Sequence, residues 1–119
     1  MIRTNYSNPP THGATVVASV LNSPELRALW EEELGEMRTR IHSMRLAMVE
    51  QLASFGAKRD FSFVARQRGM FSYSGLTAEQ VDRLKNEFGI YAVSTGRICV
   101  AALNNSNLES ISRAITQVL

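Results

Sequence analysis

The sequence predicts an α/β fold of the α+β kind, in which one long helix packs with a small sheet and further helices. Residues 23–55 carry apolar side chains at helical spacing, and no proline follows residue 24 within them. From residue 60 onward, short apolar runs alternate with helical patterns, which indicates a layered domain of strands and helices. With 119 residues, of which 45% are apolar and 20% charged, the chain is large enough for one domain with a hydrophobic core.

The first segment has an unusual composition, Arg-Thr-Asn-Tyr-Ser-Asn-Pro-Pro at residues 3–10. Each proline fixes its own φ and restricts the residue before it, so the polar side chains just upstream are expected to point in a fixed direction. A first helix is predicted at residues 11–21, and its apolar face consists of Val16, Val17, Val20 and Leu21.

The dominant element is the helix predicted at residues 23–55. Ser23 suits the N-cap, Pro24 the first helical position, and Glu25 the positive end of the helix dipole. About 30 residues give a length of about 45 Å, whereas a compact domain of this size has a radius of gyration of about 13–14 Å. The helix is therefore expected to extend beyond its own domain and to pack against protein surface outside that domain. Its apolar stripe consists of Leu26, Leu29, Trp30, Leu34, Met37, Ile41, Met44, Met48, Leu52 and Phe55.

A dimeric coiled coil is the alternative interpretation of this helix. The apolar stripe drifts around the helix and Gly35 interrupts it, which favours a globular partner over a regular coiled-coil seam. Gly56 supplies a C-terminal stop.

After the long helix, the apolar period changes. Phe61 and Phe63 alternate with polar residues, as in a short strand, and residues 66–69 read as a turn before a second strand at 70–75. Thr77 and Gln80 form a capping box. The helix that they open is predicted to end at Gly89 with three side chains facing inward, namely Val81, Leu84 and Phe88.

The last third of the chain predicts two more strands and a final helix. The strands are expected at 90–93 and 98–102, on either side of a turn at 94–97. Residues 104–107 offer several N-caps for a helix that runs to Leu119. Its inward face is predicted to consist of Leu108, Ile111, Ile115 and Val118.

Composition argues against several classes of function. The net charge is only +2, and the arginines alternate with carboxylates as on an ordinary solvated face, so nucleic-acid binding is not expected. No apolar run is long enough to span a membrane, and no signal segment begins the chain. The single Cys99 is expected to be buried in a strand and, since it cannot form an internal disulfide, fits a cytoplasmic location. No metal-ligand spacing is present. His42 is interpreted as a solvated surface group, and His12, near a helix start, as a capping or helix-dipole contact.

Two arginines stand apart as candidate binding residues. Arg97 follows Gly96 at a tight turn before an apolar strand, and Arg3 lies beside the stiff proline segment. A guanidinium group can hold a carboxylate through two parallel hydrogen bonds. Taken singly, either arginine is more readily explained as an ordinary partner in a surface ion pair.

Three motifs together resemble a known family. Residues 5–10 (NYSNPP), 69–75 (GMFSYSG) and 94–97 (STGR) are similar to the C-terminal third of class I aminotransferases, the pyridoxal-phosphate enzymes of the aspartate and aromatic amino acid type. The resemblance runs through essentially the whole chain, and residues 97–104 look closer to the bacterial aromatic branch. It implies the C-terminal part of the fold type I architecture of pyridoxal-phosphate-dependent transferases, with amino acids and 2-oxo acids as substrates, and a cytoplasmic homodimer.

The resemblance also implies roles for particular residues. Arg97 matches the arginine that holds the substrate α-carboxylate, and Phe71 matches an aromatic residue that lines the substrate pocket. Arg3 matches the arginine that crosses the dimer interface to bind a distal carboxylate. Tyr6, Ser7 and Asn8 belong to the same interface loop. Residues 1–22 would then be an interface loop and helix, and 23–119 the small domain, including the connecting helix 23–55.

The matched region lacks the reacting part of such an enzyme. The Schiff-base lysine, the phosphate-binding residues and the aspartate that pairs with the cofactor ring all lie upstream of it in the family, so no catalytic residue is assigned here. Lys58 and Lys85 fall outside any such motif. The expectation is a fragment or truncated reading frame of a transaminase that is inactive alone and does not bind the cofactor covalently. A non-catalytic module for carboxylate binding or dimerisation is the alternative.

Overall fold

The computed structural model describes residues 10–119. The chain divides into two compact units, Met1–Met37 and Arg38–Leu119. The boundary between them falls inside the long helix α3 (Pro24–Ser54). Each unit is therefore described by itself.

The first unit consists, in its described part, of α2 (Thr11–Asn22) and the first half of α3. Both helices were predicted from the sequence. Ser23 is the expected N-cap, because its hydroxyl accepts a hydrogen bond of 3.4 Å from the Leu26 N–H. No residue of α2 is buried. The apolar side chains of this unit are instead exposed by between 41% and 57%, namely Val16, Val17, Leu21, Leu26, Leu29, Trp30 and Met37.

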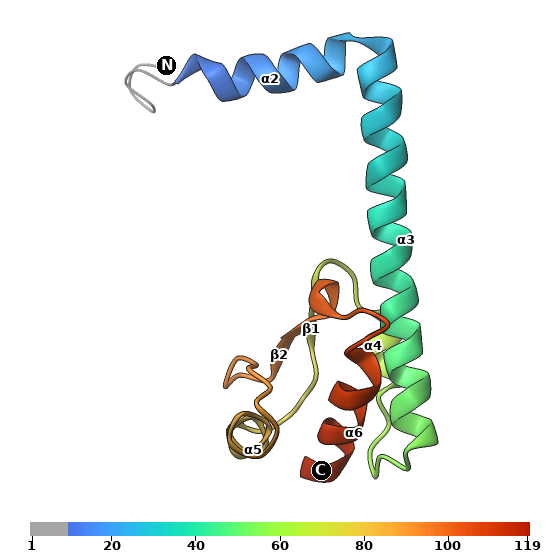
Figure 1. Ribbon diagram of the computed structural model, residues 1–119, viewed down its shortest axis with the longest axis vertical. Coiled ribbons are helices and arrows are strands. Elements are labelled where there is room, and N and C mark those ends of the chain that lie inside the picture. The colour runs from blue at the N-terminus through green and yellow to red at the C-terminus, as the bar shows by residue number, and fades with distance from the viewer. Residues whose placement is uncertain (1–9) are drawn as a thin grey trace. The chain divides into compact units, whose positions relative to one another are not determined.

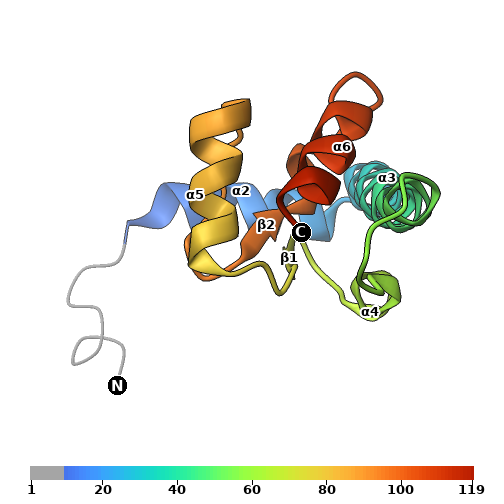
Figure 2. The same ribbon diagram turned by 90° about the horizontal axis from the view of Figure 1, so that it is seen from below.

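The second unit contains the hydrophobic core. After α3 it comprises α4 (Ser62–Arg66), β1 (Phe71–Tyr73), α5 (Ala78–Phe88), β2 (Arg97–Cys99), the 3₁₀ turn η1 (Val100–Ala102) and α6 (Leu108–Val118). In both views α6 lies between the second half of α3 and α5 (Figures 1 and 2). The two strands pair antiparallel, with Ser72 opposite Ile98. The core consists of Met48, Leu52, Phe61, Val64, Leu76, Val81, Leu84, Val100, Leu103, Leu108, Ala114, Ile115 and Val118.

The prediction of a strand around Phe61 and Phe63 is wrong, because the helix α4 occupies this segment. The Asp60 carboxylate accepts hydrogen bonds from the Ser62 N–H at 2.8 Å and from the Ser62 hydroxyl at 2.7 Å, which turns the chain at this point. Phe61 and Val64 are then buried at a spacing of three residues, which is the helical period.

The strand predicted at residues 90–93 is also absent, since the sheet holds only β1 and β2. Two hydrogen bonds close a tight turn instead, from the Gly96 N–H to the Val93 carbonyl at 2.8 Å and from the Val93 N–H to the Arg97 carbonyl at 3.3 Å. The strands predicted at 70–75 and 98–102 exist but are three residues each. The second of them ends in η1, where the Leu103 N–H reaches back to the Val100 carbonyl.

The two shorter amphipathic helices follow the prediction closely. The capping box of α5 is complete, since the Gln80 N–H donates to the Thr77 hydroxyl and the Thr77 N–H donates to the Gln80 side chain. Gly89 ends this helix in the left-handed conformation. Phe88 is 36% exposed and does not face inward as expected. In α6, Leu108, Ile115 and Val118 are buried as predicted, while Ile111 is half-buried. Among the described residues, no helix combines the length and the apolar character needed to cross a membrane.

Candidate functional site

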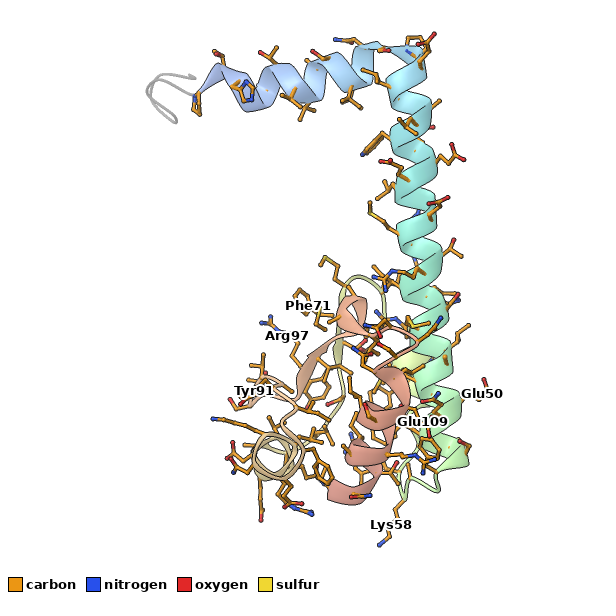
Figure 3. All side chains as sticks on the ribbon, in the orientation of Figure 1. Glu50, Lys58, Phe71, Tyr91, Arg97 and Glu109 are labelled. Atoms are coloured by element: carbon orange, nitrogen blue, oxygen red, sulfur yellow. The ribbon has the colours of Figure 1, made fainter. Side chains whose placement is uncertain are left out.

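The antiparallel pair of β1 and β2 brings Phe71 and Arg97 together on the exposed face of the sheet. Tyr73 lies opposite Arg97 and Phe71 opposite Cys99, so the side chains of Phe71, Tyr73 and Arg97 emerge on one side of the sheet. The guanidinium carbon of Arg97 lies 4.9 Å from the centroid of the Phe71 ring. Figure 3 shows both side chains projecting from the same side of the second unit, with Tyr91 nearby.

The guanidinium group of Arg97 is available to a ligand. Within residues 10–119 its side chain makes no hydrogen bond and no ion pair, whereas Arg27, Arg83 and Arg113 each pair with a glutamate one helical turn away. Stacking on Phe71 limits the orientations of the guanidinium without using its N–H donors. The arrangement can therefore bind a planar anion such as a carboxylate through two hydrogen bonds.

The turn before Arg97 is fixed from beneath by Ser74. This residue is fully buried, and both its N–H (2.9 Å) and its hydroxyl (2.6 Å) donate to the Gly96 carbonyl. Gly96 has φ of +81°, and a Cβ atom there would lie 2.6 Å from the Leu76 carbonyl oxygen. Only glycine fits this position without displacing the backbone, so the direction in which Arg97 leaves the turn is well determined.

Arg45 lies beneath β1 and is a residue that sequence reasoning missed. It is 1% exposed and is the only charged side chain that is buried among the described residues. Its guanidinium group donates to the carbonyls of Val64 (3.3 Å) and Gly69 (2.6 Å) and to the Ser72 hydroxyl. Burial lowers the pKa of Arg45 below its ordinary value.

The prediction that the arginines form an ordinary solvated face is thus wrong for Arg45. Arg40 is also tied to the sheet, because it donates to the carbonyls of Leu103 (3.0 Å) and Ala101 (2.9 Å). A signal was present in the sequence, since Arg45 lies on the same helix face as Ile41, Met48 and Leu52.

The outer edge of β1 is covered by a side chain. The amide of Gln67 accepts a hydrogen bond from the Tyr73 N–H at 2.9 Å and donates one to the Tyr73 carbonyl at 3.0 Å. Gln67 thereby occupies the position that a neighbouring strand would take.

Several expected site residues cannot be placed or lie elsewhere. Arg3, Tyr6, Ser7 and Asn8 lie outside the described residues. His42 is exposed, as the sequence indicates; His12 is also exposed, and Cys99 is half-buried rather than buried. Within residues 10–119, no group of three His, Cys, Asp or Glu side chains could hold a metal ion.

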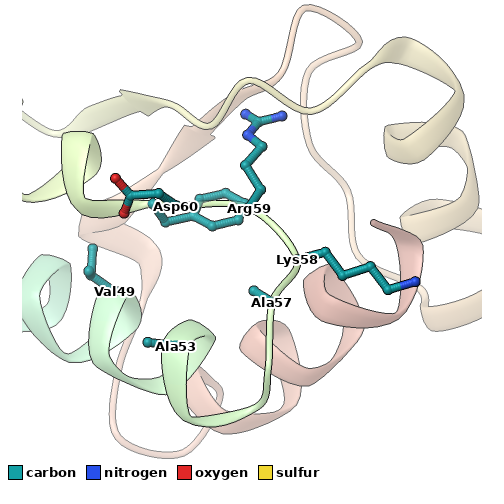
Figure 4. A pocket seen from close by; sticks show the side chains of 7 residues that line it. Val49, Ala53, Ala57, Lys58, Arg59 and Asp60 are labelled. Atoms are coloured by element: carbon teal, nitrogen blue, oxygen red, sulfur yellow. The ribbon is translucent and has the colours of Figure 1, made fainter.

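Neither Phe71 nor Arg97 lines either of two cavities in the second unit. The larger, of about 310 Å³, lies between the end of α3 and residues 57–61, and Lys58 points away from it (Figure 4). Arg59 donates to the carbonyls of Ser74 and Gly75, just after β1. The smaller, of about 140 Å³, is apolar and lies among α5, β2 and α6.

The fold places the chain in a structural class. A solved aromatic-amino-acid aminotransferase from Burkholderia pseudomallei, covalently bound to pyridoxal phosphate, superimposes with a TM-score of 0.94 at 69% identity. The alignment covers 99% of this chain and 30% of that structure. The expected architecture is confirmed: the chain has the fold of part of a fold type I pyridoxal-phosphate-dependent transferase.

Sequence comparison then gives the family. The model of the aminotransferase class I and II family matches residues 1–115, and the chain belongs to this family. It is 85% identical over 119 residues to an aspartate aminotransferase of Pseudomonas aeruginosa, and 50% identical over 118 residues to an aromatic-amino-acid aminotransferase of Escherichia coli. The chain spans 30% of the length of each of these relatives.

The described residues do not fit as a covalent holder of pyridoxal phosphate. Lys58 and Lys85 are both exposed, and Lys58 lies at the opposite end of the second unit from Arg97 (Figure 3). A lysine that holds the cofactor must be enclosed beside the substrate site, and neither residue meets this requirement.

Proposed function

We propose that this chain supplies the substrate-carboxylate site of an aminotransferase. The enzyme would move an amino group between an aromatic or dicarboxylic L-amino acid and a 2-oxo acid such as 2-oxoglutarate. The observation that carries this proposal is the exposed guanidinium of Arg97, held over Phe71 with no acidic partner in residues 10–119. In this role Arg97 binds the α-carboxylate, and Phe71 lines the pocket beside it.

The other roles follow from the family and from the motifs at the start of the chain. Arg3 would bind the distal carboxylate of a dicarboxylic substrate in the site of the second subunit of a homodimer. Tyr6, Ser7 and Asn8 would belong to the same interface loop, and residues 23–55 would connect the small domain to the cofactor domain. Pyridoxal phosphate would be held by residues outside these 119, in a cytoplasmic enzyme.

The decisive experiment uses the complete enzyme that contains this chain. Arg97→Lys keeps the charge but loses the planar fork, so we expect KM for amino acid and 2-oxo acid to rise about 10- to 100-fold. Arg113→Lys is the matched control, because Arg113 also lies over an aromatic ring but pairs with Glu109 on α6. Comparing tyrosine with aspartate as amino donors identifies the branch. Transamination that is insensitive to Arg97→Lys would contradict the proposal.

The alternative is a non-catalytic module that binds carboxylates or dimerises, and the free guanidinium of Arg97 supports it equally well. Calorimetry of the 119-residue chain with 2-oxoglutarate separates the two. The transaminase proposal predicts no turnover by this chain, and no pyridoxyl group on Lys58 or Lys85 after incubation with the cofactor and borohydride reduction. Tight binding of 2-oxoglutarate by the chain alone, abolished by Arg97→Ala, would favour the alternative.

A further inference from the structure

The buried guanidinium of Arg45 has a feature that stability alone does not explain. All three of its hydrogen-bond acceptors are neutral, and no carboxylate compensates its charge. Removing a charge from water is costly, and apolar residues of similar volume often replace buried charged groups without loss of stability. A role in fixing geometry accounts for the residue better than a role in holding the core together.

The acceptors of Arg45 surround the point where the chain enters β1. Gly69 lies two residues before Phe71, and Ser72 directly follows Phe71. The Ser72 side chain lies on the buried face of β1. The backbone of Ser72 pairs with Ile98, the residue after Arg97. A shift of Ser72 would therefore move the Phe71 ring relative to the guanidinium that it stacks on.

The same helix also holds the other strand. Arg40, five residues before Arg45 on α3, donates to the carbonyls of Ala101 and Leu103, which follow β2. Two arginines of α3 thus bond to the two sides of the sheet, Arg45 at β1 and Arg40 at the segment that follows β2. All of these contacts lie within the second unit, Arg38–Leu119.

We infer that Arg45 is a positioning residue, which sets the stacking of Arg97 on Phe71 through its bonds to Ser72 and Gly69. The inference rests on the proposed role of Arg97 in binding the substrate carboxylate. Arg45 itself does not touch the substrate, because it is enclosed beneath β1. Its replacement is expected to disturb recognition of the carboxylate and to leave the fold in place.

The first test needs no enzymatic activity. In proton NMR spectra of the 119-residue chain, we expect the ring of Phe71 to shift the Arg97 side-chain protons upfield. We expect the ring of Phe55 to do the same for Arg113, whose guanidinium carbon lies 4.3 Å from that ring. Arg45→Met should abolish the shift at Arg97 and preserve the shift at Arg113. Ser72→Ala, which removes only one hydroxyl, should reduce the shift at Arg97, and Arg45→Lys should restore it in part.

An unchanged Arg97 shift in both Arg45→Met and Ser72→Ala overturns the inference. If Arg45→Met unfolds the chain and both upfield shifts disappear, the Ser72→Ala variant decides the question. Loss of the Arg97 shift alone supports a positioning role for Arg45, and loss of both shifts shows a general structural role.

The second test uses the complete enzyme. Arg45→Met should raise KM for carboxylate-bearing substrates about 10- to 100-fold, as expected for a misplaced binding group. It should leave turnover of a primary amine without a carboxylate unchanged. The effects of Arg45→Met and Arg97→Lys should also be non-additive, because the two residues act on one contact. The inference would be rejected if Arg45→Met reduced activity equally toward the amino acid and the amine, or if the effects of the two variants were additive. An inactive parent enzyme would instead refute the proposed function, and the NMR result would then decide the inference.

Discussion

Arg97 and Arg45 lie on opposite faces of the same two-stranded sheet and use their guanidinium groups in opposite ways. Arg97 leaves its donors open to solvent, whereas Arg45 directs its donors to backbone carbonyls and one hydroxyl. The motif around Arg97 can be recognised from the sequence because it depends on local turn chemistry. Helical spacing places Arg45 on the apolar face of α3, but its bonding partners lie 19 to 27 positions further along the chain, and the local pattern does not identify them.

Gly96 gives a residue-scale prediction for stability. Gly96→Ala places a Cβ against the Leu76 carbonyl in a left-handed backbone, so we expect a loss of about 2–4 kcal/mol from strain and overpacking combined. Gly56→Ala is the matched control, because Gly56 also has a positive φ but nothing within 4 Å of its Cβ position, and it should cost only about 1 kcal/mol. Equal losses for the two variants in urea unfolding would show that the contact with Leu76 has no effect.

Asp60 gives a prediction about pH. The hydrogen bond from the Ser62 hydroxyl, followed by that from the Ser62 N–H, holds the pKa of Asp60 below its ordinary value. A depressed pKa in the folded state means that the bond stabilises the fold above the unfolded-state pKa and is lost as the pH falls through the folded-state value. We expect Ser62→Ala to raise the NMR titration midpoint of Asp60, and Ser110→Ala on α6 to leave it unchanged. An unchanged midpoint in Ser62→Ala would contradict this assignment.

At the scale of elements, four of the five α-helices in residues 10–119 were predictable from the sequence, but only two of the four predicted strands exist. The helices α2, α3, α5 and α6 each carry their own caps or a sustained apolar period, so local sequence determines them. The segments at 61–63 and 90–93 have the apolar alternation of strands, but a strand also needs a neighbour to pair with. Asp60 turns the first segment into α4, and the turn closed by Gly96 and Val93 leaves the second without a partner.

The capping box of α5 can be tested as an element. Thr77→Ala removes the acceptor of the Gln80 N–H, so we expect a loss of about 1 kcal/mol in the free energy of unfolding. Thr77→Ser keeps the hydroxyl and should retain most of the stability. Because α5 packs on α6 in the core of the second unit, its fraying should appear as faster amide exchange in both helices.

At the scale of the whole molecule, the two compact units differ in how far their apolar side chains are buried. The second unit buries a continuous core, whereas the described part of the first unit exposes most of its valines and leucines and Trp30. An exposed apolar surface of this kind is typical of a region that other protein surface covers. This is consistent with a chain that spans 30% of the length of its relatives.

The exposed side chains of the first unit predict association of the isolated chain. We expect concentration-dependent light scattering and binding of a hydrophobic dye, both reduced by the double variant Val17→Glu and Leu29→Glu. Leu46→Glu is the control, since Leu46 is an exposed apolar residue of the second unit. A monodisperse monomer at all concentrations would show that the exposed apolar side chains of the first unit do not drive association.

Gln67 has a consequence for the behaviour of the chain during synthesis and storage. An open strand edge is a template on which a second polypeptide can add itself, and this is how many proteins begin to form fibrils. By bonding to both backbone groups of Tyr73, the Gln67 amide ends the β1 edge with a side chain that no further chain can extend. The strand beneath the Phe71–Arg97 face thus offers no free backbone groups at Tyr73 with which another chain could pair.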